Sequence, residues 1–130
     1  MVIDSSALLA VVFQEPGYAA LVELLANADL VAAGAPTLTE TGIVLEARLG
    51  SAAHGMLERI LDEFDIEEIR FGEVHWREAV AASRKLGKGR HPAGLNFGDG
   101  LTHAVARLTG EPLLCVGDDF PETDLEVVAR

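Results

Sequence analysis

The first ten residues, MVIDSSALLA (1–10), place a carboxylate between two apolar runs. Residues 1–3 have the length and character of a buried strand, whereas residues 7–10 favour a helix. Asp4 lies at the junction and is followed by two serines. An aspartate in this place can cap the helix that begins near Ser6, or it can supply part of a site at the edge of a sheet.

Short apolar strands alternate with helical segments along the rest of the chain, and no linker or repeat interrupts them. Such strands, separated by helices, are typical of a parallel sheet covered on both faces. The sequence therefore predicts a single α/β domain over residues 1–130, with a short central sheet of about four parallel strands flanked by helices on both faces. The predicted strands are 1–4, 30–34, 65–71 and 112–116, and the predicted helices are 6–13, 17–28, 36–49, 52–64, 73–86 and 97–109.

The composition describes one acidic, folded domain. The chain has 130 residues, of which 49% are hydrophobic, and this is enough to build a core. Its net charge of −11 disfavours non-specific binding to nucleic acid. The single cysteine, Cys115, cannot form an intrachain disulfide and suits a reducing compartment. Because no basic leader or apolar run of roughly 18 residues is present, we expect a cytoplasmic protein without a membrane partner.

Basic residues are concentrated in one segment of this acidic chain. The segment includes both lysines and runs into a loop rich in glycine and proline, GKGRHPAGLN (87–96). A solvated helix end explains such a cluster, because cations there favour the helix dipole. A strip that contacts phosphates is the alternative, and from this segment alone the solvated helix end is the favoured interpretation. The segment contains Arg84, Lys85, Lys88, Arg90 and His91.

Two of the predicted strands end in acidic residues. Asp4 ends the first strand, and Asp118 and Asp119 follow the last. Because ligands of open parallel sheets bind beyond the carboxyl ends of the strands, these acids converge if the two strands are neighbours. Each acid also has a purely structural explanation, a helix cap for Asp4 and a turn for the pair.

Two further acids occupy helices. Glu40 shares a helix face with apolar residues, among them Ile43 and Val44, so we expect its carboxylate to point toward the core or a cleft. Asp99 lies in the first turn of its helix, three residues after Asn96. A capping box with Asn96 and the helix dipole would also account for Asp99.

A cluster of these carboxylates has a definite chemistry. Like charges raise one another's pKa values unless a cation is present. Oxygen ligands without thiolates or clustered imidazoles suit Mg²⁺ or Mn²⁺. Such an ion neutralises phosphate oxygens and lowers the pKa of a bound water, which is the chemistry of phosphoryl transfer.

Four segments of the chain, in matching order and spacing, resemble the PIN-domain ribonucleases, specifically the VapC-like toxins of bacterial type II (VapBC) toxin–antitoxin systems. The resemblance covers nearly the whole chain and implies a PIN-like fold. The segments are VIDSS (2–6), TLTETGIVLEAR (37–48), HPAGLNFGDGLTHAVA (91–106) and PLLCVGDDFPETDL (112–125).

The resemblance implies a catalytic role for three acids, Asp4, Glu40 and Asp99. In the family these surround one or two Mg²⁺ or Mn²⁺ ions that activate water for RNA cleavage. Asp4 and Asp99 would hold the metal, directly or through water, and Glu40 would help to orient or deprotonate the attacking water.

The same resemblance points to two supporting positions. Ser6 matches a hydroxyl that supports the site by hydrogen bonding. The fourth acid falls in GDDF (117–120), where we predict Asp119, directly before Phe120, with Asp118 as the alternative. Gly117 stands where some members of the family carry an acid or an amide, so a second metal stays an open question.

The implied partners are an RNA (tRNA, rRNA or mRNA), a small VapB-like antitoxin and a second copy of the chain. Arg84, Lys88 and Arg90 would follow the RNA backbone. The antitoxin of such systems lays a helix into a groove, which the first helices would supply if their apolar residues are not simply core. These residues are Leu8, Leu9, Val12, Phe13, Tyr18 and Leu21.

Three other classes of protein share parts of the pattern. A receiver-type signalling domain needs a lysine at a later strand end, whereas both lysines here lie within residues 84–91. A haloacid-dehalogenase-type phosphatase needs an Asp-x-Asp pair, and Asp4-Ser5-Ser6 lacks the second acid. A catalytically silent PIN-like binding module would be expected to lose one or more of the acids.

Overall fold

The computed structural model describes residues 1–128, and the strands and helices predicted within this range are all present. The last two residues of the predicted domain 1–130 lie outside the described part. The strands are β1 (Val2–Ile3), β2 (Val31–Gly34), β3 (Ile66–Ile69) and β4 (Leu113–Leu114). The helices are α1 (Ser5–Val12), α2 (Tyr18–Asn27), α3 (Ala35–Leu49), α4 (Ala53–Glu63), α5 (Glu73–Leu86) and α6 (Phe97–Thr109), with a 3-10 turn η1 (Gly50–Ala52) between α3 and α4.

The four strands form one parallel sheet in the order β3-β2-β1-β4. Val2 of β1 lies opposite Ala32 of β2 and Leu113 of β4. The first and last strands are therefore neighbours, and the acids that follow them leave the sheet at the same edge. The prediction of an α/β fold with a short parallel sheet is confirmed.

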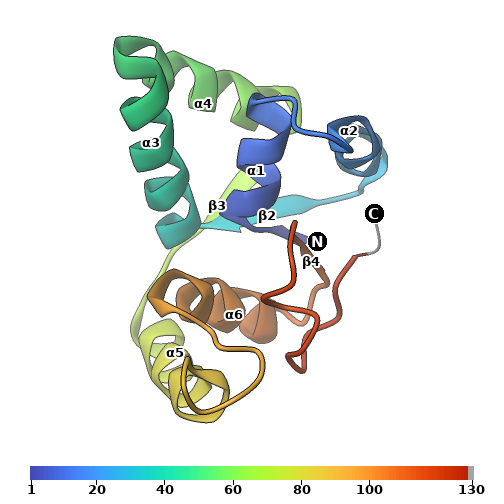
Figure 1. The fold of residues 1–130 in the computed structure, drawn as a ribbon. Helices are drawn as coiled ribbons and strands as arrows, with labels where there is room; N and C mark the ends of the chain where they lie inside the picture. The colour runs from blue at the N-terminus through green and yellow to red at the C-terminus, as the bar shows by residue number, and fades with distance from the viewer. Residues whose placement is uncertain (129–130) are drawn as a thin grey trace.

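Helices cover both faces of this sheet. In Figure 1, α1, α2 and α4 lie above the sheet, α5 and α6 lie below it, and α3 stands along one side. Neighbouring strand residues point to opposite faces, so Ile3 and Leu114 belong to one core whereas Val2 and Leu113 belong to the other. Within residues 1–128, no helix combines the length and the apolar character that a bilayer span requires.

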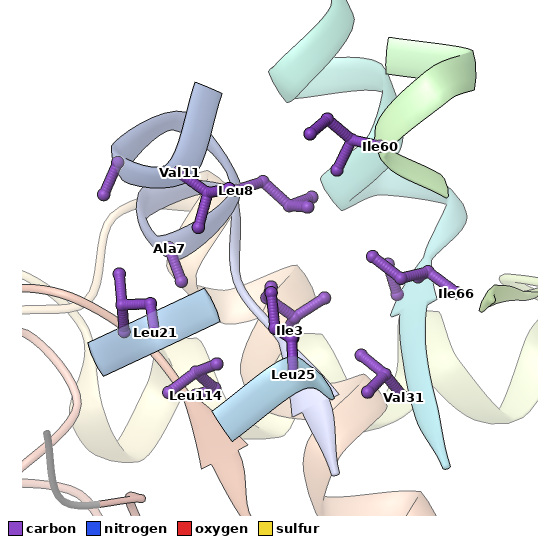
Figure 2. Packing of buried hydrophobic residues seen from close by; sticks show 12 residues of the cluster. Ile3, Ala7, Leu8, Val11, Leu21, Leu25, Val31, Ile60, Ile66 and Leu114 are labelled. Carbon is purple, nitrogen blue, oxygen red and sulfur yellow. The ribbon is translucent and has the colours of Figure 1, made fainter. Parts of the chain in front are cut away.

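The core above the sheet uses part of the apolar surface of the first helices (Figure 2). Leu8 and Leu21 are 0% and 1% exposed, so both are core residues. The other apolar residues of the predicted groove keep part of their surface exposed: Leu9, Val12, Phe13 and Tyr18. The labelled side chains of this core are Ile3, Ala7, Leu8, Val11, Leu21, Leu25, Val31, Ile60, Ile66 and Leu114.

The basic loop between α5 and α6 is closed at its base. The backbone N–H of Lys88 donates to the carbonyl of Leu95 at 3.1 Å, and the N–H of Leu95 donates to the carbonyl of Leu86 at 2.9 Å. At Gly87, where the chain leaves α5, a Cβ atom would collide with the carbonyl oxygen of Ser83. Glycine is therefore required at this close approach, and the loop returns the chain to the start of α6.

Candidate active site

Asp4 leaves β1 and caps α1, as predicted for its structural role. Its Oδ2 atom accepts hydrogen bonds from the backbone N–H of Ser6 at 3.0 Å and from the Ser6 hydroxyl at 2.6 Å. The Ser6 hydroxyl in turn accepts from the N–H of Val116 at 2.9 Å, just beyond β4. Asp4 is only 6% exposed. Ser6 therefore ties the first acid to the chain segment that leads to the last two.

Glu40 extends from α3 to the first turn of α6. Its Oε1 atom accepts a 2.7 Å hydrogen bond from the hydroxyl of Ser5, a buried residue. A Cβ atom at Gly98 would lie 2.5 Å from Oε2 of Glu40, so the glycine leaves room for the carboxylate. The hydroxyls of Thr37 and Thr102, 3.2 Å apart, join α3 to α6 nearby.

The helix face that carries Glu40 looks into a cleft. Glu40, Ile43 and Val44 line a hollow of about 340 Å³ between α3 and α6. The prediction that Glu40 faces the core or a cleft is thus resolved in favour of the cleft, because Ile43 is 62% exposed.

Asp99 is the third residue of α6 and forms the predicted capping box with Asn96. The N–H of Asn96 donates to Oδ2 of Asp99 at 3.1 Å, and the N–H of Asp99 donates to Oδ1 of Asn96 at 2.9 Å. Burial raises the pKa of Asp99 to about 6, although the hydrogen bond from Asn96 opposes the rise; the negative charges of Asp119, Asp4 and Glu40 add to it. Three carboxylates from separate parts of the chain therefore act on that of Asp99.

Asp118 and Asp119 lie in the irregular segment that follows β4, as the turn interpretation predicted, and both are exposed. Gly117 precedes them with a φ of 102°, which only glycine adopts readily. The ring of Phe120 is 2% exposed and anchors the segment in the core below the sheet. Of the two acids, Asp119 is the one whose charge raises the pKa of Asp99.

The donor set fits a hard divalent cation. Within residues 1–128, no three Asp, Glu, His or Cys side chains are placed to hold one ion together. Mg²⁺ usually keeps several waters and takes only one or two carboxylates, so a partly hydrated ion does not need such a group. Burial is the main cause of the raised pKa of Asp99, and the negative charges of Asp119, Asp4 and Glu40 add to it; a cation bound there would offset both effects.

The basic segment leads directly into this site. It begins at the C-terminal end of α5 and runs through the loop to Asn96, which caps the helix that carries Asp99. The candidate phosphate contacts are all exposed: Arg84, Lys85, Lys88 and Arg90.

Two features were missed by the sequence prediction. Ser5 orients Glu40, and the only signal in the sequence is its position next to Asp4. An apolar rim, defined here as Ile43, Trp76, Val80 and Phe97, has exposed fractions of 62%, 49%, 53% and 84%. Ile43 and Phe97 line the cleft, whereas Trp76 and Val80 line, with Phe97, a second hollow between α5 and α6. Periodicity finds such helix faces but does not tell which of them a domain leaves uncovered.

Comparison with known proteins agrees with this geometry. The PIN-domain family model matches residues 1–126. The chain is 45% identical over 127 residues to Ribonuclease VapC36 of Mycobacterium tuberculosis and to VapC ribonuclease Mb2004c of Mycobacterium bovis, covering 97% of this chain and 91% of each relative. The chain therefore belongs to the PIN-domain family, and within it to the VapC proteins.

Solved structures share the fold at much lower identity. VapC20 of Mycobacterium tuberculosis, described as a sarcin-ricin loop cleaving toxin, has a TM-score of 0.80 and 18% identity, with 99% of this chain and 98% of that chain covered. VapBC2 of Rickettsia felis, bound to a DNA fragment from its promoter, has a TM-score of 0.78 and 16% identity, with 97% and 94% covered. At these identities the likeness establishes the fold.

Proposed function

We propose that this protein is a metal-dependent endoribonuclease that acts, as a single domain over residues 1–130, as the toxin of a VapBC-type module in the cytoplasm. The observation that carries the proposal is the convergence of four acids, because the negative charges of Asp4, Glu40 and Asp119 all raise the pKa of Asp99. The 45% identity to two VapC ribonucleases over nearly the whole chain supports it. Cleavage of cellular RNA would inhibit growth until an antitoxin binds.

Each acid has a task that its contacts support. Asp4 and Asp99 would hold Mg²⁺ or Mn²⁺, directly or through water, and their hydrogen bonds to Ser6 and Asn96 keep the carboxylates in place. The bound ion would neutralise phosphate oxygens and lower the pKa of a water. Glu40 and Asp119 would orient that water or accept its proton.

Two kinds of residue would assist. Ser6 holds Asp4 and the chain beyond β4 together, whereas Asp118 adds negative charge at the rim of the site. Arg84, Lys88 and Arg90 would contact the RNA backbone. On a chain with a net charge of −11, this binding would be local and strongly weakened by salt.

An antitoxin partner is proposed on the same basis. One structural neighbour is a VapBC assembly. The partly exposed apolar residues of α1, of its C-cap and of α2, among them Leu9, Phe13 and Tyr18, would line the groove for a helix of a VapB-like protein.

We also propose a homodimer, or a toxin–antitoxin hetero-oligomer that contains one. The apolar rim gathers four large exposed side chains along two hollows that share Pro36, Phe97 and Leu101, and such a patch is the usual mark of an interface. A second copy seated there would remove these side chains from water and leave the acids inside a shared groove.

The decisive experiment incubates labelled RNA with the EDTA-treated protein, with and without added Mg²⁺ or Mn²⁺. We expect cleavage only with the metal, and none by folded Asp4→Ala or Asp99→Ala protein. Wild-type activity in either variant would contradict the assignment of the acids. Absence of cleavage with every RNA tested would favour the catalytically silent binding module, and a positive acyl-phosphate assay would favour a receiver-type phospho-acceptor.

A further inference from the structure

The tail segment, defined here as residues 117–125, carries the fourth acid without the support of a helix or strand. Phe120 fixes one point of it by burial, at 2% exposure. Thr123 closes a turn around that point, because its backbone N–H and its hydroxyl donate to the carbonyl of Phe120 at 2.9 and 2.6 Å. These hydrogen bonds shape the turn without reaching α6, and Phe120 meets that helix through the apolar core it shares with Val105 and Ala106. A polar attachment to the helix is made elsewhere in the segment.

Asp124 makes that attachment through two residues of α6. Its Oδ1 atom lies 2.8 Å from Nε2 of His103, and its Oδ2 atom is bonded to the guanidinium of Arg107. Arg107 also binds Glu78 of α5 through Nε at 3.1 Å, so it spans three parts of the chain. We call His103, Arg107 and Asp124 the α6 clamp.

The α6 clamp lies in register with the catalytic acid of the same helix. His103 follows Asp99 by four residues and Arg107 follows by eight, so all three lie along one side of α6. The helix that places Asp99 thus also holds the segment that places Asp119. Burial opposes a low pKa at Asp124, yet the hydrogen bond and charge of His103 and the charge of Arg107 hold it below its ordinary value.

Packing alone does not explain a histidine at position 103. It is 2% exposed, and its Nδ1 atom has no hydrogen-bond partner among the described residues. A buried polar atom left unpaired lowers stability. Apolar residues such as the neighbouring Ala104 and Val105, which are also buried, carry no such side-chain atom. The pair that Asp124 makes with Arg107 joins two half-exposed side chains, and such surface pairs usually add little to stability. Geometry, rather than stability, is what the clamp supplies.

We propose that His103 and Arg107 are positioning residues that act through Asp124 to hold the tail segment, and with it Asp119, against the metal site. The inference rests on the proposed nuclease function. Asp119 would not ligate the ion, but its negative charge acts on Asp99, which would, so displacing Asp119 should lower both metal affinity and activity. The loss should lie near the lower end of the roughly 10- to 100-fold range seen when groups that orient metal ligands are removed.

The test compares Asp124→Ala with Glu122→Ala, a matched control that removes an exposed acid from the same segment. Mn²⁺ affinity is measured by calorimetry, exchange of the amides of residues 117–125 by mass spectrometry, and RNA cleavage as separate kcat and KM values. We expect Asp124→Ala to weaken Mn²⁺ binding about tenfold, to speed amide exchange in the tail segment, and to lower kcat with KM little changed. The control should match wild type.

A second pair of variants separates positioning from packing. His103→Gln keeps an N–H donor for Asp124 and should recover most of the Mn²⁺ affinity, whereas His103→Leu fills the space without a donor and should not. Equal Mn²⁺ affinity in these two variants, or wild-type affinity in Asp124→Ala, would overturn the inference while the nuclease function stands. A wild-type protein that neither binds Mn²⁺ nor cleaves RNA would overturn both.

Discussion

Asp4 and Asp119 reach the same site from opposite ends of the chain and by different means. Asp4 follows a central strand, is 6% exposed, and accepts two hydrogen bonds from Ser6. Asp119 is exposed on an irregular segment that depends on Phe120 and Asp124 for its place. The comparison teaches that sheet register fixes the first acid, whereas individual side-chain anchors must fix the last.

We expect the largest effect from substituting Asp4, the acid that the sheet holds in place. Asp4→Asn removes a charge that the geometry of β1 holds in place, and we expect RNA cleavage in Mg²⁺ to fall by about 10²- to 10³-fold. Initial rates on labelled RNA measure this. Glu46→Gln, an exposed acid on α3 outside the site, is the control and should keep the wild-type rate.

Ser6→Ala tests whether the positions of Asp4 and Asp119 depend on each other, because Ser6 contacts both Asp4 and the chain that leads to Asp119. The variant loses the hydroxyl that donates to Asp4 and accepts from Val116. We expect a loss of about 1 to 2 kcal/mol in the free energy of unfolding, from urea titration, and about a tenfold lower cleavage rate. An unchanged free energy of unfolding and an unchanged cleavage rate would mean that Asp4 and the segment carrying Asp119 are held in place independently.

The raised pKa of Asp99 predicts a dependence of stability on pH in metal-free protein. The folded carboxyl holds its proton up to about pH 6, whereas the ordinary value is 3.8. The contribution of the Asp99 carboxyl to stability is therefore fully present below about pH 4 and is lost as the pH rises through 6. Asp99→Asn should remove this loss and add about 1 kcal/mol at pH 7, since solvent screens a half-buried group. Urea unfolding at pH 4 to 7 in EDTA measures it; a variant less stable than wild type at pH 7 would contradict the expectation.

The smallest effect is expected at the basic segment. Lys88→Ala and Arg90→Ala should each raise KM for RNA by about threefold at low salt, with kcat unchanged, and should lower the slope of log affinity against log salt by about 1. Arg59→Ala, an exposed cation on α4, should change neither. Equal effects of all three substitutions would show that only net charge matters.

Local contacts were predictable from the sequence. The alternation of apolar runs with helices predicted the α/β fold, and three-residue spacing predicted the capping box of Asn96 with Asp99. Long-range pairs were not, because nothing in the spacing links Ser5 to Glu40 or His103 to Asp124. Those contacts depend on how helices dock on the sheet.

The direction of helix faces was also beyond the sequence. The stripe of Glu40, Ile43 and Val44 was recognised as a shared face, but the core and a cleft were equally acceptable destinations for it. The structure leaves it facing the cleft, whose other side is formed by Phe97, Gly98 and Leu101 of α6. Composition alone does not distinguish a covered face from an open one.

The most direct test of whether Asp4 and Asp119 belong to one site is the pKa of Asp99 in metal-free protein. NMR titration of the Asp99 carboxyl carbon measures this pKa. The account predicts a pKa of about 6 in the wild type. It predicts a lower value in Asp4→Asn and in Asp119→Asn, and no change in Glu122→Gln. An ordinary pKa in the wild type, or a value that ignores Asp119, would contradict the account.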